Sequence, residues 1–281
     1  MLKHRLITGP ILIALLLGLV WLDETLAAGA HAPRGAVLFA IALVAAVAAA
    51  LELDRVFAAH ELRTRRWLTA AAAVTGLTLS FAVPASTGGV AAVAALASGM
   101  AGAFVAALLV FSHGRRVDGV VPAAGAVVFA FVYLGLLLGF LVAIRREHSA
   151  WTVVAVILTT KSCDIGAYFT GRAIGRRKLI PWLSPGKTWE GLVGGVLTSA
   201  VVAVAAVSLL PDLDASPLAA GLAGATFGLV GQLGDLAASL FKRGAGLKDS
   251  GRALPGLGGM LDVLDSPLMV APVAFWLLHA A

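Results

Sequence analysis

The stretch GVVPAAGAVVFAFVYLGLLLGFLVAI, residues 119–144, is the clearest indication of the fold class of this chain. It contains no charged side chain over 26 residues, and about 20 apolar residues are enough for a helix to cross the hydrocarbon core of a bilayer. Eight further apolar runs flank it, at residues 6–22, 36–53, 67–86, 89–112, 150–170, 189–210, 216–240 and 260–279. We therefore predict an all-α, polytopic integral membrane protein, a helical bundle of about nine transmembrane helices.

The composition of the 281 residues agrees with this class. Sixty per cent are hydrophobic and 13% are charged, whereas about 25% of a soluble domain is charged. The mean hydropathy is +0.96. These values exclude a soluble globular domain, a disordered chain and a coiled coil. A single cysteine excludes a disulfide framework and a cysteine-rich metal site.

The basic residues predict the orientation. With the N-terminus in the cytoplasm, 17 of the 21 lysines and arginines lie on the cytoplasmic side, as the positive-inside rule requires. The net charge of +6 is therefore explained by cytoplasmic loops, and we expect no nucleic-acid partner. Arg145 and Arg146 are the exception, weakly offset by Glu147. The first run reads as an uncleaved helix, because it is long enough to span the membrane.

The acidic residues divide the chain into two parts of one membrane domain, residues 1–281. Before residue 150 the apolar runs have no charge deep inside, whereas after it aspartates lie in or beside them. Ionisable groups inside a membrane are costly and usually functional. We expect residues 1–149 to be scaffold helices and residues 150–281 to contain the catalytic helices and loops.

The first cluster of polar residues begins with Lys161 and Asp164. They are three residues apart in one predicted helix, so they share a face and can form an ion pair. The alternative interpretation is a pair that only neutralises itself within the bundle.

A second segment of this cluster, Ser184 to Glu190, reads as a Pro-Gly turn followed by Thr188 as a helix N-cap, with Glu190 in the first turn. Backbone N–H groups at such a helix start favour a phosphate, and Lys187 adds a cation. The alternative is an ordinary capped helix on a basic loop.

The second cluster lies in residues 234–266. Asp235, Ser239 and Lys242 lie on one helix face, and Asp262 and Asp265 lie on one face at the start of the last run. Several carboxylates brought together repel one another unless a cation lies among them. Oxygen ligands without nearby Cys or His suit Mg²⁺. The alternative is a tight turn with acids that cap a helix.

The glycines of residues 256–259 supply backbone without side chains, suitable for the close approach of a ligand. Together the two clusters describe a site for phosphates and a divalent metal at the cytosolic face. No Ser-His-Asp set or activated cysteine is evident. The pattern therefore favours phosphoryl or nucleotidyl transfer by direct displacement.

The second cluster resembles the signature of phosphatidate cytidylyltransferases, also called CDP-diacylglycerol synthases, of the bacterial type. The matching residues, in order and spacing, are Ser239, Lys242, Arg243, Lys248, Asp249, Pro255, Gly256, Gly258, Gly259, Asp262 and Asp265. The upstream segments 164–168 and 184–191 are also similar to that family. The resemblance covers residues 160–272.

The resemblance implies an enzyme that joins CTP to phosphatidic acid, giving CDP-diacylglycerol and pyrophosphate for phospholipid biosynthesis. It implies Mg²⁺, with K⁺ in some members. It further implies a bacterial-type inner membrane location with the active site facing the cytoplasm, contact with the bilayer lipid, and a possible homodimer.

The resemblance also assigns roles to residues. Asp235, Asp262 and Asp265 are the expected metal ligands, and the catalytic set adds Lys248 and Asp249. The expected substrate-binding residues are Ser239, Lys242, Arg243, Lys187, Thr188, Gly258 and Gly259.

Two positions depart from the family signature. Leu257 replaces a histidine of the glycine loop, and Val263 replaces an arginine after the first aspartate of the last motif. Arg252 is a candidate for a compensating cation. The alternatives are a CTP-dependent enzyme for another lipid phosphate, such as an isoprenoid or ether-lipid phosphate, an inactive paralogue, or a cation-coupled transporter using the aspartates.

Overall fold

The computed structural model describes residues 2–83, 89–113, 117–251 and 258–280, with side chains from residue 14 onward. The helices are α1 (Leu2–Ala28), α2 (Ala36–Ala59), α3 (Arg66–Ala82), α4 (Gly89–Ser112), α5 (Val120–Ala130), the π-helix η1 (Phe131–Leu136), α6 (Leu137–Glu147), α7 (Ala150–Ile174), α8 (Trp189–Leu209), α9 (Pro217–Gly244) and α10 (Met260–His279). Two short strands, β1 (Lys178–Ile180) and β2 (Ser184–Thr188), form a hairpin.

Each of the nine predicted apolar runs coincides with a helix of the described chain, since α5, η1 and α6 continue into one another. Within the part of the chain whose side chains are described, seven helices are long and apolar enough to cross a membrane, and α3 is not one of them. Helix α3 has only 17 residues. The predicted all-α polytopic membrane protein is confirmed.

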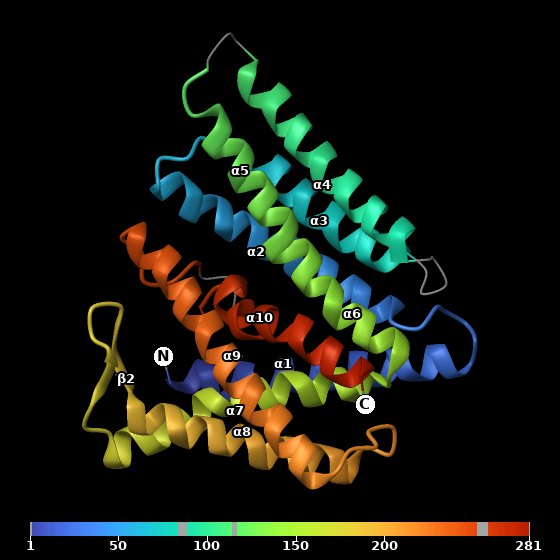
Figure 1. The fold of residues 1–281 in the computed structure, drawn as a ribbon, viewed down its shortest axis with the longest axis vertical. Helices are drawn as coiled ribbons and strands as arrows, with labels where there is room; N and C mark the ends of the chain where they lie inside the picture. The colour runs from blue at the N-terminus through green and yellow to red at the C-terminus, as the bar shows by residue number, and fades with distance from the viewer. Residues whose placement is uncertain (1, 84–88, 114–116, 252–257, 281) are drawn as a thin grey trace.

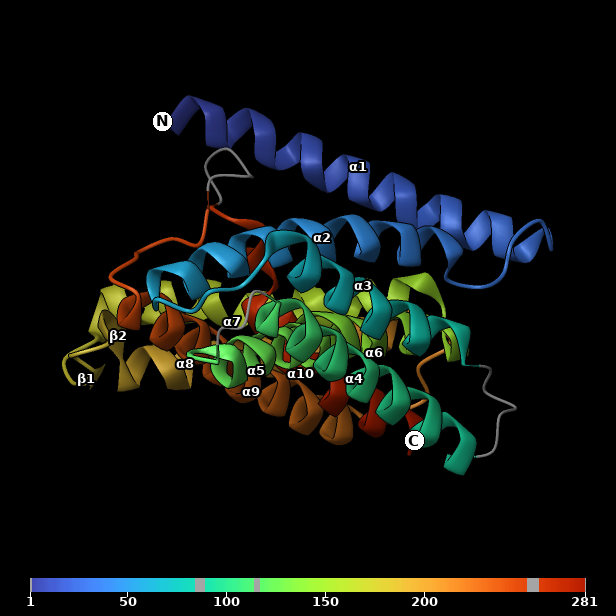
Figure 2. The ribbon, with the colours of Figure 1, turned by 90° about the horizontal axis from the view of Figure 1, so that it is seen from above.

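The helices form two groups with α10 between them (Figure 1). Helices α2 to α6 make the first group, and α7, α8 and α9 make the second, while α10 packs against α9, α6, α2 and α7. Figure 2 shows α1 along the outside of the bundle, where it contacts α2 and α7. The N-terminus and the hairpin lie toward one side of the molecule and the C-terminus toward the other (Figure 1).

Glycines allow the helices to pack closely. A Cβ atom on Gly135 of η1 would lie 2.7 Å from the carbonyl oxygen of Ala73 in α3, and one on Gly195 of α8 would lie 2.6 Å from that of Cys163 in α7. Small residues serve this purpose in membrane proteins because lipid gives no hydrophobic drive for helices to associate. Close backbone packing therefore accounts for these two glycines.

The hairpin was not expected from the sequence, which predicted only a Pro-Gly turn. Its strands pair antiparallel, and its base is held by Glu190, whose carboxylate accepts the N–H groups of Arg176 at 3.1 Å and Arg177 at 3.2 Å. Thr188 caps α8 as predicted, its hydroxyl accepting the N–H of Gly191 at 3.1 Å. Glu190 thus supports the hairpin.

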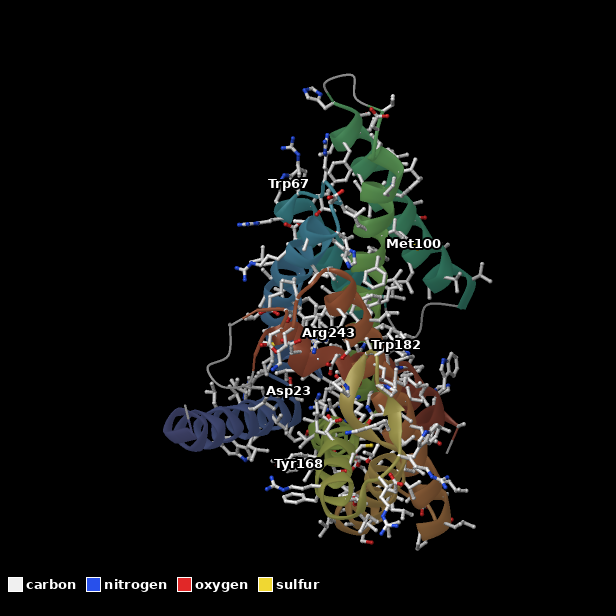
Figure 3. All side chains as sticks on the ribbon, turned by 90° about the vertical axis from the view of Figure 1, so that its left-hand side faces the viewer. Asp23, Trp67, Met100, Tyr168, Trp182 and Arg243 are labelled. Carbon is white, nitrogen blue, oxygen red and sulfur yellow. The ribbon has the colours of Figure 1, made fainter. Side chains whose placement is uncertain are left out.

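The two arginines that break the charge asymmetry are structural. Arg145 is buried and donates to Asp23 at 2.5 Å, with Glu24 at 3.3 Å. Arg146 donates to the carbonyl oxygens of Phe81 and Val83. Both guanidinium groups have partners within the bundle. They are therefore not free charges of a loop, which are the charges that the positive-inside rule counts. Asp23, labelled in Figure 3, belongs to α1, so its pair with Arg145 joins α1 to α6.

Candidate active site

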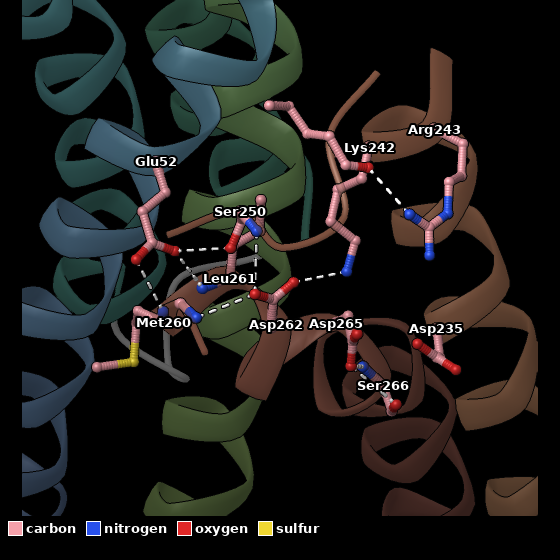
Figure 4. A network of polar contacts seen from close by, with 12 residues as sticks. Glu52, Asp235, Lys242, Arg243, Ser250, Met260, Leu261, Asp262, Asp265 and Ser266 are labelled. Carbon is pink, nitrogen blue, oxygen red and sulfur yellow. Dashed lines mark hydrogen bonds and ion pairs between the residues drawn. The ribbon is translucent and has the colours of Figure 1, made fainter. Parts of the chain in front are cut away.

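The predicted site residues gather where α9 and α10 face each other, close to α7 and β2. Asp235 and Lys242 are seven residues apart on α9 and therefore lie on one face, two turns apart. Asp262 and Asp265 are three residues apart on one face of α10, near the N-terminal end of that helix (Figure 4). The structure thus brings together four of the five residues of this cluster that the sequence placed on shared helix faces.

Lys187 connects the hairpin to this site. Its ammonium group forms an ion pair with the carboxylate of Asp235, and the two side chains are 20% and 27% exposed. The sequence placed both residues in the site without predicting their pairing. Because both remain partly accessible, a ligand can reach the pair.

Lys161 lies between two aspartates. Its Nζ atom is 3.8 Å from Oδ2 of Asp164 and 3.4 Å from Oδ1 of the buried Asp265. The predicted pair of Lys161 and Asp164 is confirmed, and α10 adds a second carboxylate to it. Oδ1 of Asp265 also accepts the backbone N–H of Ser266 at 2.6 Å and its hydroxyl at 3.0 Å.

Asp262 organises the start of α10. Its Oδ1 atom accepts from Lys242 at 2.5 Å, and its Oδ2 atom accepts the N–H groups of Ser250 at 3.0 Å and Gly259 at 2.9 Å. Lys242 is buried against this carboxylate. Its predicted contact with a substrate phosphate stays a prediction, and its side chain is only 9% exposed.

Glu52 of α2 is a site residue that the sequence reasoning missed. Its carboxylate is 3% exposed and accepts the hydroxyl of Ser250 at 2.9 Å and the N–H groups of Met260 at 3.0 Å and Leu261 at 2.9 Å (Figure 4). The signal in the sequence was an acidic residue at the end of an otherwise apolar run, residues 36–53. The part predicted to be scaffold therefore supports the site directly.

The carboxylates of Asp262 and Glu52 lie close to the two described glycines of the loop, Gly258 and Gly259. Gly258 has a φ of +95°, which favours glycine, and a Cβ atom on Gly259 would lie 2.3 Å from Oε2 of Glu52. The sequence predicted that a ligand could approach these glycines closely. The space beside Gly259 is instead occupied by the carboxylate of Glu52. Arg252, Leu257 and the remaining loop positions lie outside the described residues.

The other predicted residues lie around this centre. Ser239 is half-buried on α9, and Arg243, Lys248 and Asp249 are exposed. The guanidinium group of Arg243 donates to the carbonyl oxygen of Leu247 at 3.3 Å. Val263 is half-buried beside Asp262. Their roles toward a substrate stay predictions.

The acids around Asp235 have the donor chemistry of a hard-cation site. Asp235 acts electrostatically on both Asp164 and Asp265, so the three carboxylates share one region with the ammonium groups of Lys161 and Lys187. If these five groups are all ionised, the three carboxylates and two ammonium groups together have a net charge of −1. Carboxylate oxygens are the ligands that Mg²⁺ prefers. Within the described residues no three acidic, His or Cys side chains stand close enough to hold a metal as they are placed. Metal binding stays a prediction.

Comparison with known proteins connects this site to a family. A sequence model of the cytidylyltransferase family matches residues 3–281. An uncharacterised protein of Escherichia coli K12, YnbB, is 44% identical over 133 residues, which cover 47% of this chain and 44% of that protein.

Proteins named phosphatidate cytidylyltransferase are similarly close. The one from Pseudomonas aeruginosa is 43% identical over 46% of this chain and 48% of its own length. The one from Bacillus subtilis is 37% identical over 55% of this chain and 58% of its own length. The chain thus spans about half the length of the curated relatives it matches.

Proposed function

Because the chain belongs to the cytidylyltransferase family, we propose that it transfers the cytidylyl group of CTP to phosphatidic acid, giving CDP-diacylglycerol and pyrophosphate. The observation that carries the proposal is the group of lysines paired with aspartates where α7, β2, α9 and α10 meet. Such pairs supply cations for phosphates and carboxylates for a metal in one place.

The reaction is a direct displacement. A phosphate oxygen of phosphatidic acid attacks the α-phosphorus of CTP, the bond from that phosphorus to the bridging oxygen breaks, and pyrophosphate leaves with the bonding electrons. The protein has little covalent chemistry to perform, so positioning and charge stabilisation account for catalysis.

Lys161 and Lys187 are the cations best placed to receive phosphates. Their side chains are 30% and 20% exposed, whereas that of Lys242 is 9% exposed. Lys161 and Lys187 can exchange a carboxylate for a phosphate oxygen at modest desolvation cost, because part of each pair is already in contact with solvent. Lys242 instead keeps Asp262 and the start of α10 in place.

Asp235 and Asp265, with Asp164 beside them, are the residues that would hold Mg²⁺. When bound, the ion would neutralise charge on the triphosphate and so assist the departure of pyrophosphate. Asp262 was expected to be a ligand as well, but its two oxygens already accept three hydrogen bonds. We therefore propose that Asp262 positions the site and that Asp235 is the principal ligand.

An assay of the purified protein in detergent micelles tests the function. We expect CDP-diacylglycerol and pyrophosphate to form from CTP and phosphatidic acid only when Mg²⁺ is present. An isoprenoid phosphate in a parallel reaction tests the other lipid class. If CDP-lipid forms only with the isoprenoid phosphate, the lipid assignment is wrong. If no phospholipid or isoprenoid phosphate gives CDP-lipid, the proposed catalysis is wrong.

A further inference from the structure

Tyr133 carries a buried hydroxyl group without a partner in the described part of the chain. The residue is 4% exposed, and its Oη atom has no hydrogen-bond partner. Most buried polar groups in proteins are hydrogen-bonded, because a buried donor without an acceptor loses its interaction with water and gains nothing in return. An exception of this kind calls for a physical reason.

The position of Tyr133 directs it toward the site. It lies in the π-helix η1, a type of turn that occurs often at functional sites. Gly135, two residues later, packs against α3, whereas the ring of Tyr133 stacks on Phe129 at 5.0 Å and meets Phe241 of α9 edge-on at 6.1 Å. The ring of Tyr133 therefore faces Phe241 of α9, the residue that precedes Lys242 in the sequence.

The hydroxyl group lies within electrostatic range of the site carboxylates Asp265 and Asp235. It donates to neither of them. Asp235 is paired with Lys187, and Asp265 contacts Lys161 and Ser266. Among the described residues of this region, the phenol is thus an unpaired hydrogen-bond donor within range of two carboxylates whose lysine partners, Lys161 and Lys187, can attract an anion.

We infer that the hydroxyl of Tyr133 donates a hydrogen bond to a phosphate oxygen of the bound substrate. The inference rests on the proposed function, because it takes the ligand near Lys161 and Lys187 to be a phosphate. The phosphate belongs either to CTP or to the lipid. A ligand oxygen supplies the acceptor that the ligand-free protein lacks.

The test is the variant Tyr133→Phe, which removes one oxygen atom and keeps the ring. Thermal unfolding of the purified protein is measured without ligand, with CTP and Mg²⁺, and with phosphatidic acid in micelles, and kcat/KM is measured for both substrates. We expect an unchanged or higher Tm without ligand, because no internal hydrogen bond is lost. We expect a smaller Tm increase with the ligand that Tyr133 contacts, and kcat/KM about ten- to a hundred-fold lower. The two ligand arms identify the source of the phosphate.

Ser80→Ala is the matched control in the same half of the bundle. The hydroxyl of Ser80 already donates to the carbonyl oxygen of Gly76 at 2.9 Å. Its removal should slightly lower the ligand-free Tm and leave both ligand-induced shifts and kcat/KM unchanged.

Three results would overturn the inference. Unchanged ligand shifts and kcat/KM in Tyr133→Phe would mean that the hydroxyl contacts ordered water only, with the proposed function intact. A lower ligand-free Tm with normal kcat/KM would mean that the hydroxyl has a structural partner. If neither ligand shifts the Tm of the unaltered protein, the proposed function and the inference fail together.

Discussion

At the scale of single residues, Glu52 connects three parts of the chain through one side chain. It accepts two N–H groups that begin α10 and the hydroxyl of Ser250, which lies nearly 200 positions later in the chain. Carboxylates are favoured at a helix N-terminus, where backbone N–H groups lack intrahelical acceptors. The contact joins α2, the loop before α10 and α10 itself.

Glu52→Ala should therefore lower both stability and turnover. The loss leaves three donors unsatisfied, and we expect it to cost about 1–3 kcal/mol. Glu52→Gln keeps one acceptor oxygen and should recover part of both properties. Thermal unfolding and CDP-lipid formation measure the effect, with Asp214→Ala, an exposed acid between α8 and α9, as the control. A Glu52→Ala protein with normal stability would contradict this role.

Asp235 and Asp262 should respond differently to loss of charge. Asp235→Asn removes a proposed metal ligand that has one lysine partner, so turnover should fall at least about a hundred-fold with little change in Tm. Asp262→Asn weakens three hydrogen bonds and the pair with Lys242, so both Tm and turnover should fall. Equal loss of Tm in both variants would reject this division, and near-normal activity of Asp235→Asn would reject the metal assignment.

Asp212, between α8 and α9, should contribute a pH-dependent stability. Partial burial raises its pKa, but the backbone N–H of Ser149 and the hydroxyls of Ser149 and Thr152 outweigh this effect and hold the pKa below its usual range. The contribution is complete above the ordinary value of about 4 and is lost as the pH falls through the lower folded-state pKa. Between pH 7 and acidic pH, the Tm of Asp212→Asn should therefore decline less steeply than the Tm of the unaltered protein. Parallel declines of the two proteins would contradict the prediction.

At the scale of elements, close packing between α3 and η1 sets the position of Tyr133. A Cβ atom on Gly135 would meet the backbone of Ala73 at 2.7 Å and that of Gly76 at 2.8 Å. Backbone atoms cannot move aside as a flexible side chain can, so the helices would have to separate.

Gly135→Ala should thus destabilise the protein by about 1–3 kcal/mol through overpacking. Gly125→Ala is the matched control one helix segment earlier, since nothing lies within 4 Å of a Cβ atom there. It should be neutral or stabilising by up to about 1 kcal/mol, because alanine is the better helix former. Thermal unfolding of the two variants measures the difference. Equal changes in Tm would contradict the prediction that overpacking at the α3–η1 contact destabilises the protein.

At the scale of the whole molecule, the predicted orientation places the hairpin in the cytoplasm. Trp182, in the hairpin, is 76% exposed, and Asp214 is exposed beyond the other end of α8. The lone cysteine, Cys163, is 1% exposed and should give little background labelling.

Labelling with a membrane-impermeant thiol reagent tests the orientation. Trp182→Cys should react only when the cytoplasmic face is accessible, and Asp214→Cys only from the opposite face. The reverse pattern would show that the chain is inserted the other way round. A homodimer stays a prediction of the family resemblance.

The class of the protein and most of its helices followed from the amino-acid sequence alone, because whether an apolar run can cross a bilayer depends on the length and polarity of that run. The cap at Thr188 and the pair of Lys161 with Asp164 followed equally from short spacings along one helix. The hairpin did not, because its strands are held by Glu190 from the next helix.

The partner of each buried charge depends on how the helices pack in three dimensions. Lys187 with Asp235, Lys161 with Asp265 and Glu52 with the start of α10 all join different elements, and spacing along the chain carries no information about such contacts. The same holds for Tyr133, whose ring meets Phe241 of α9 while Gly135 packs η1 against α3. The charged groups of the site could be named from the sequence, whereas the packing of α10 between the two helix groups sets which of them form ion pairs, since an ion pair depends on distance in space.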